Sequence, residues 1–67
     1  MKPLTARQVE EILRQNGFQL VKAEGSHFKW RNAAGRCVPV PHHGNKTMPQ
    51  GTLLSIFRQA GITPPKQ

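Results

Sequence analysis

The run from His27 to Arg31 alternates polar and aromatic side chains, and this alternation constrains the fold more than any other feature. Because successive side chains of a strand point to opposite faces of a sheet, the aromatic residues share one face and the polar residues share the other. These are Phe28 and Trp30 on the first face, and His27, Lys29 and Arg31 on the second. The aromatic face needs an apolar cover, so the run predicts a sheet that is covered on one face and open on the other.

Two apolar stripes at helical spacing flank this strand and can supply the cover. Each stripe starts at a capping-box pattern and ends at a glycine that can adopt a left-handed conformation. The patterns are Thr5 with Gln8 and Gly17 for the first stripe, and Thr47 with Gln50 and Gly61 for the second, which begins near residues 47–49. The polar positions of the first helix are expected to face water, namely Arg7, Glu10, Glu11 and Arg14.

Three short strands are predicted between the helices, over residues 18–23, 26–31 and 36–40. The first alternates too irregularly for its faces to be assigned. Pro39 has no N–H to donate to a neighbouring strand, so the third strand is expected at an edge of the sheet. The predicted fold is therefore α+β, in the order α-β-β-β-α, with a three-stranded antiparallel sheet and both helices on one face. Residues 1–67 form a single domain in this prediction, with 63–67 as a flexible tail.

The charge distribution points to an acidic partner. The formal net charge is +7 and no acidic residue follows Glu24, which favours nucleic acid or an acidic protein as partner. No apolar run approaches the length of a membrane-spanning helix, and the first residues lack a signal-peptide pattern. The single Cys37 fits a reducing compartment. We therefore expect a cytoplasmic protein with no membrane association.

His27 is the candidate catalytic residue, placed directly after the small residues Gly25 and Ser26. A histidine has an unperturbed pKa of roughly 6.5 and so can give or take a proton near neutral pH. A titratable group on a cationic surface indicates that a polyanion is brought to it. The alternative is that His27 is only a solvated or structural residue.

Other residues are candidates for holding the phosphates of a polyanion. They are Ser26, Lys29, Arg31, Arg36, His42, Lys46, Gly51 and Thr52. Gly51 and Thr52 lie near the start of the second helix, where unpaired N–H groups favour an anion. The alternative is that Gly51 only lets this helix lie close to the sheet. His42 and His43 could contact phosphate, donate a second proton, or simply be exposed.

No pattern of metal ligands is present. Cys37 together with His27, His42 and His43 matches no established zinc spacing. Glu24 would be a single magnesium ligand at most. We therefore expect neither a metal ion nor a small-molecule cofactor.

An ordered series of short motifs resembles the HicA-type toxins, the partners of HicB-type antitoxins. The motifs are Asn16-Gly17-Phe18, Gly25-Ser26-His27, Gly35-Arg36, Val38-Pro39-Val40-Pro41-His42, Gly51-Thr52-Leu53-Leu54-Ser55-Ile56 and Ala60-Gly61. The resemblance runs from about Val9 to Ile62. It implies a fold like that of double-stranded-RNA-binding domains, ribosome-independent cleavage of mRNA, and neutralisation by an antitoxin. The catalytic histidine of the family falls on His27, whereas Phe28 and Lys29 stand where many members have further histidines.

These residues predict a mechanism in which RNA supplies its own nucleophile, the 2′-hydroxyl. His27 would act as general base or acid, while nearby cations stabilise the charged transition state. The second proton-transfer group is left open between His42, His43 and a lysine. The alternative function is a non-catalytic RNA-binding module of the same fold, and a small basic ribosomal or DNA-binding protein is a third.

Overall fold

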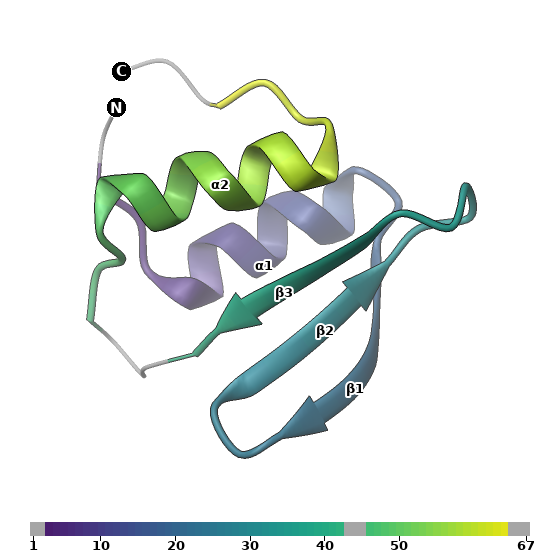
Figure 1. The fold of residues 1–67 in the computed structure, drawn as a ribbon, viewed down its shortest axis with the longest axis horizontal. Helices are drawn as coiled ribbons and strands as arrows, with labels where there is room; N and C mark the ends of the chain where they lie inside the picture. The colour runs from purple at the N-terminus through teal and green to yellow at the C-terminus, as the bar shows by residue number, and fades with distance from the viewer. Residues whose placement is uncertain (1–2, 43–45, 65–67) are drawn as a thin grey trace.

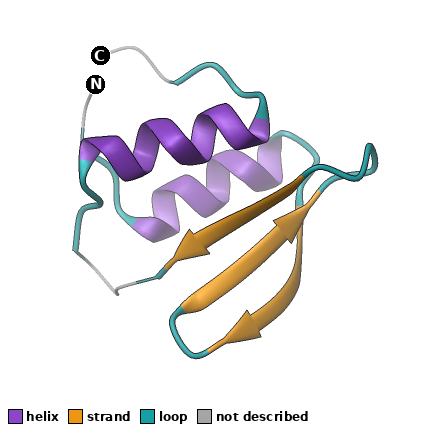
Figure 2. Cartoon of the chain, in the orientation of Figure 1, coloured by secondary structure: helices purple, strands orange, loops and turns teal. Residues whose placement is uncertain are grey.

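The computed structural model describes residues 3–42 and 46–64 (Figure 1). Its elements follow in the order α1 (Ala6–Gln15), β1 (Gln19–Glu24), β2 (His27–Arg31), β3 (Cys37–Pro41) and α2 (Gln50–Ala60). The strands form one antiparallel sheet in the order β1-β2-β3, and both helices lie on one side of it (Figure 2). The predicted fold class is confirmed. His43 and the last three residues of the predicted tail lie outside the described residues.

The three predicted strands each begin one residue too early. Phe18 lies between α1 and β1, and its N–H donates to the Leu13 carbonyl oxygen of α1 at 3.0 Å. Ser26 lies in the turn between β1 and β2. The backbone N–H of Arg36 donates to the Asn32 side chain at 2.9 Å, so Arg36 belongs to the hairpin loop.

The ends of α1 agree with the sequence pattern. The Thr5 hydroxyl accepts a hydrogen bond from the Gln8 N–H at 3.3 Å, and the Gln8 side chain accepts one from the Thr5 N–H at 2.9 Å. Gly17 follows the helix with a φ of +86°, in the left-handed region where a side chain is unfavourable. The predicted capping box and the glycine stop are both confirmed.

The start of α2 differs from the prediction. Its N-cap is Pro49, and no side chain bonds to the cap, so the capping box expected from Thr47 and Gln50 is wrong. Thr47 instead lies in a short antiparallel bridge with Thr5, which holds it away from the helix start. The predicted glycine stop is confirmed at the other end, where Gly61 has a φ of +71°.

The core lies between the two helices and the covered face of β2 and β3. Trp30, Val38 and Val40 point into it, as the alternation predicts, and Phe28 is half-buried at its border. The helices contribute Val9, Leu13, Leu53, Ile56 and Phe57. β3 is an edge strand, as Pro39 indicates, and β1 is the other edge. Every residue of β1 is exposed, so the helix layer covers β2 and β3 but not β1. No helix in the described part of the chain is long and apolar enough to cross a membrane.

Candidate functional site

The face of the sheet that the helices leave open carries a row of polar side chains from β2. His27, Lys29 and Arg31 are all exposed, and they alternate with the half-buried Phe28 and the buried Trp30. Two residues along a strand span about 7 Å, so the row presents its three side chains at regular intervals. The structure therefore places the predicted catalytic histidine and two predicted phosphate ligands on one surface, which we call the open face.

β1 adds an acid and a second lysine to the open face. Residues directly opposite in an antiparallel pair project their side chains on the same side of a sheet. Glu24 lies opposite His27, and Lys22 lies opposite Lys29. The Lys22 ammonium is 3.4 Å from a Glu24 carboxylate oxygen. The sequence alone did not place these two residues on the open face, because a register shift between Leu20 and Lys22 breaks the alternation of β1.

A tight turn brings the ends of β1 and β2 together at His27. Only Gly25 and Ser26 separate the two strands, and Gly25 has a φ of +57°. A glycine at the first central position suits the two-residue turns that match the twist of a hairpin. The small residues before His27 therefore place it at the corner of the sheet, opposite Glu24.

His42 lies on the covered side of the sheet, and the structure does not bring it beside His27. It follows the buried Val38 and Val40 at the same two-residue spacing, whereas His27 is on the opposite face. Its ring stacks on Phe28 with 4.9 Å between centroids and 27° between planes. Its Nε2 is 3.5 Å from a Glu10 carboxylate oxygen. His42 is thus a partner of the helix layer, next to the acid Glu10.

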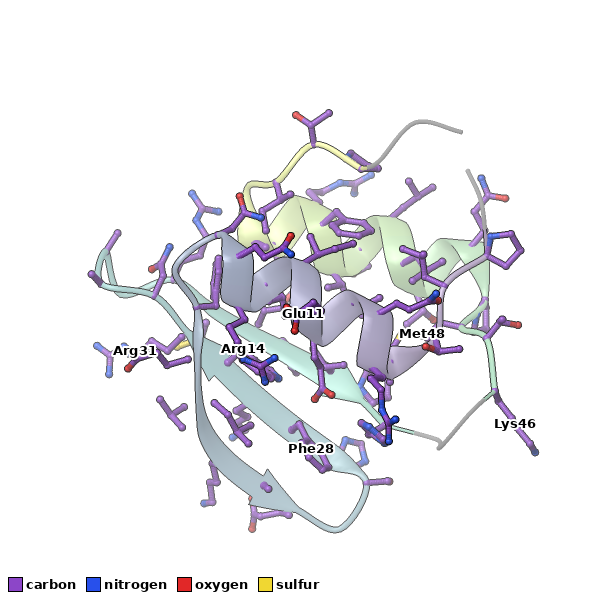
Figure 3. All side chains as sticks on the ribbon, turned by 180° about the vertical axis from the view of Figure 1, so that it is seen from behind. Glu11, Arg14, Phe28, Arg31, Lys46 and Met48 are labelled. Carbon is purple, nitrogen blue, oxygen red and sulfur yellow. The ribbon has the colours of Figure 1, made fainter. Side chains whose placement is uncertain are left out.

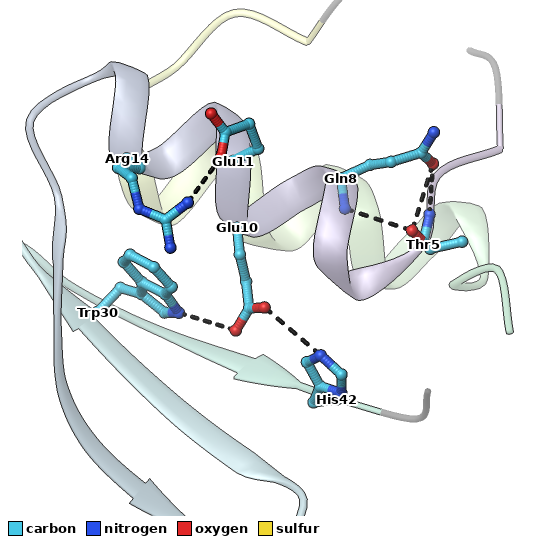
Figure 4. A network of polar contacts seen from close by, with 7 residues as sticks. All are labelled: Thr5, Gln8, Glu10, Glu11, Arg14, Trp30 and His42. Atoms are coloured by element: carbon cyan, nitrogen blue, oxygen red, sulfur yellow. Dashed lines mark hydrogen bonds and ion pairs between the residues drawn. The ribbon is translucent and has the colours of Figure 1, made fainter. Parts of the chain in front are cut away.

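Glu10 is buried, and the expectation that it faces water is wrong. Figure 4 shows its carboxylate directed toward Trp30 and His42. The Trp30 indole N–H donates to one of its carboxylate oxygens at 3.2 Å, while the other oxygen faces His42. An indole N–H needs an acceptor when the ring is buried, and Glu10 on α1 supplies this carboxylate. The guanidinium of Arg14 lies 5.4 Å from the centre of the same indole ring. The signal in the sequence was a buried tryptophan with no partner assigned to its N–H.

The remaining candidate residues do not lie on the open face. The Arg36 guanidinium donates to the Gln59 carbonyl oxygen at 3.0 Å, which ties it to the last turn of α2. Lys46 lies before α2, at the other end of the molecule from Arg31 (Figure 3). Gly51 and Thr52 are in the first turn of α2, so the predicted phosphate ligands fall into separate groups.

Gly51 is not needed for close packing. A methyl group added there would meet no atom within 4 Å, and the residue is exposed. The alternative that Gly51 lets α2 lie tightly on the sheet is therefore wrong.

The open face has a shallow hollow beside Lys29. Its volume is about 220 Å³, and it is lined by Val21, Lys29, Cys37, Val38 and Pro39. A second hollow of about 210 Å³ lies next to Arg31 and also borders Val21. Within the described residues, no three His, Cys, Asp or Glu side chains gather closely enough to hold a metal ion. The surface combines a titratable imidazole, several cations and two hollows, of which the one beside Lys29 is mainly apolar.

Comparison with known proteins identifies the family. Residues 6–62 match the family described as the HicA toxin of bacterial toxin–antitoxin systems. None of the curated proteins compared with the chain matches it. The matched range begins with the first residue of α1 and extends past the end of α2, so it covers every element of the fold. The chain therefore belongs to the HicA family of bacterial toxins.

Proposed function

We propose that this HicA toxin is an endoribonuclease that cleaves mRNA without the ribosome and without a metal ion, using His27 to move a proton. The observation that carries the proposal is the position of His27 on the open face, in one row with Lys29 and Arg31. A polyanion can approach this row because neither helix covers it. The surface thus offers a proton-transfer group and phosphate-binding charge at the same place.

The chemistry uses a nucleophile that RNA already contains. The 2′-hydroxyl attacks the adjacent phosphorus, the bond to the 5′-oxygen breaks, and a cyclic phosphate and a 5′-hydroxyl result. One proton must leave the 2′-oxygen and one must reach the departing 5′-oxygen. His27 performs one of these transfers, and the cations beside it stabilise the extra negative charge on the phosphate. The reaction needs no added nucleophile, and the cations of the open face supply positive charge, so we assign no role to a metal ion.

Lys29 is the group we favour for the second proton transfer or for charge stabilisation. It is the nearest cation to His27 on the same face of β2, whereas His42 lies on the other face of the sheet. The exposed Arg31 lies one step further along the row and is suited to hold a neighbouring phosphate. Ser26, in the turn before His27, is our candidate for a phosphate contact at the corner.

The partner of a HicA toxin is an antitoxin, and we propose a HicB-type protein that covers the open face. Carboxylates set against Lys29 and Arg31 would speed association and block RNA in one step. A structure of the complex in which His27 stays accessible to solvent and RNA would contradict this.

The function is tested with His27→Ala and purified mRNA in the absence of ribosomes. His27 is exposed and contributes nothing to the core, so the variant should keep the wild-type free energy of unfolding within about 0.5 kcal/mol. Its cleavage rate should fall by about 10² to 10⁴, as expected for a lost general acid or base. RNA affinity should change little, since phosphate contacts dominate it.

Two controls define what each outcome means. Arg58→Ala removes an exposed cation from α2, away from the open face, and should leave the rate unchanged. Wild-type cleavage in excess EDTA should also continue at the same rate, and its loss would end the metal-independent mechanism. A folded His27→Ala protein that cleaves at the wild-type rate would end the catalytic role of His27. A wild-type protein that binds RNA but does not cleave it would favour the non-catalytic RNA-binding module.

A further inference from the structure

A buried polar contact ties the end of β3 to α1, and the proposed chemistry does not use it. Glu10 on α1 accepts from the Trp30 indole at 3.2 Å with one oxygen, and its other oxygen is 3.5 Å from Nε2 of His42. The Glu10 side chain is 12% exposed and that of His42 is 25% exposed. A carboxylate this buried is costly unless it is bonded, so its two partners fix its position.

His42 in turn contacts the residues on both sides of His27. Its backbone N–H donates to the Ser26 carbonyl oxygen at 2.6 Å, and its ring stacks on Phe28. His27 therefore lies between two neighbours that are both held by the same residue. Its own side chain remains on the open face, away from these contacts.

The corner at His27 has little other support from the helix layer. β1, which carries the opposite side of the turn, is exposed along its whole length, and Phe28 is only half-buried. The turn between the strands is exposed at Gly25 and half-buried at Ser26. An exposed hairpin end of this kind moves easily unless contacts restrain it. The chain of contacts from Glu10 through His42 supplies such a restraint.

We propose that Glu10 and His42 are positioning residues, which hold the Ser26–Phe28 backbone so that the imidazole of His27 meets the scissile phosphate in a productive geometry. This rests on the proposed catalytic role of His27. Misplacing a reacting group by about 1 Å costs on the order of 10² in rate. The contacts therefore act on the chemical step, through His27, and not on RNA binding.

The first test measures kcat and KM for a short RNA with His42→Ala and His42→Gln. Activity is expressed per folded molecule, at a temperature where each variant is folded. His42→Ala should lower kcat by about 10-fold or more and change KM by less than about twofold, because phosphate contacts on the open face are intact. His42→Gln keeps an N–H donor at the position of Nε2 and should recover most of the loss.

Further variants control for loss of folding and for the removal of an acid from α1. His42→Leu keeps the packing against Phe28 but cannot bond to Glu10, and it replaces His42→Ala if the latter does not fold. Glu11→Ala is the matched control for Glu10→Ala. Glu11 is the neighbouring acid on α1, and among residues 3–42 and 46–64 its carboxylate bonds only to the exposed Arg14. Glu10→Ala should lower kcat as His42→Ala does, whereas Glu11→Ala should leave it unchanged.

The decisive experiment repeats His42→Ala in the His27→Ala background. If His42 acts through His27, its removal should have no further effect on the residual rate. An equal further fall in that background, or a wild-type kcat for folded His42→Ala, would overturn the positioning role. Failure of the proposed function is seen separately, as a wild-type rate in His27→Ala alone.

Discussion

On one face of β2 the side chains of Phe28 and Trp30 pack beneath the helix layer, whereas on the other His27 and Lys29 are exposed. The polar groups beneath the helix layer are all bonded: among the described residues, no buried side-chain nitrogen or oxygen lacks a hydrogen-bond partner. On the open face Lys29 and Arg31 form no ion pair within the described part of the chain, whereas Lys22 is paired with Glu24. One five-residue strand thus supplies the core anchor and the candidate site at once.

The largest expected effect comes from breaking the covered face. Trp30→Ala removes a side chain that is 3% exposed and also leaves the Glu10 carboxylate without its indole donor. Large-to-small changes of this kind cost about 3 to 5 kcal/mol of unfolding free energy, so activity should be lost through unfolding. Urea denaturation followed by circular dichroism measures the change.

Lys29→Ala is the matched control for Trp30→Ala, one residue away on the other face. It should stay within about 0.5 kcal/mol of the wild-type free energy of unfolding. Equal losses of unfolding free energy in the two variants would show that both faces of β2 contribute to stability, against the burial pattern.

The features that sequence predicted well depend on residues near one another in the chain. The Thr5–Gln8 capping box and the stop at Gly17 follow from hydrogen bonds that span only a few residues. The two faces of β2 follow from strand alternation alone, which is why the placement of His27 on an open surface was confirmed.

The features that sequence did not predict depend on distant partners. The Glu10–Trp30 bond joins residues 20 apart and the bond from Arg36 to Gln59 joins residues 23 apart. Neither pairing follows from a local pattern. The sequence therefore predicts that Glu10 faces water and that Arg36 binds phosphate. The position of Glu24 opposite His27 could not be predicted for a related reason. The bulge in β1 shifts the register, and the register depends on pairing with β2.

We expect Arg36 to contribute to stability, whereas Lys29 on the open face contributes to RNA binding. Arg36→Ala removes a hydrogen bond to a carbonyl at the end of α2 and a favourable charge at the helix C-terminus, and should cost about 1 kcal/mol of unfolding free energy. The salt dependence of RNA binding should not change. In Lys29→Ala, stability should hold, while the slope of log affinity against log salt should flatten by about 0.7.

Binding titrations over a range of salt concentrations, together with denaturation curves, test both variants. If the slope of log affinity against log salt is flatter in Arg36→Ala than in Lys29→Ala, Arg36 contacts RNA phosphate after all. It would also show that RNA extends around the hairpin toward the end of α2.

The smallest expected effect concerns Gly51, in the first turn of α2. Alanine fits there without contact, and glycine within a helix is less favourable than alanine by roughly 0.5 to 1 kcal/mol, so Gly51→Ala should raise the free energy of unfolding by about 0.5 kcal/mol. Gly61→Ala is the contrasting control. Its φ of +71° and an Arg36 atom 3.3 Å from the added carbon should make it destabilising.

RNA affinity of the stabilised Gly51→Ala protein then decides how far the site extends beyond the open face. If a phosphate approaches the backbone at the start of α2, the added methyl group obstructs it. RNA affinity then falls although the free energy of unfolding rises. Unchanged affinity would confine RNA to the row on β2 and remove Gly51 and Thr52 from the candidate site. A loss of stability would contradict the empty surroundings of Gly51 and restore close packing as the reason for the glycine.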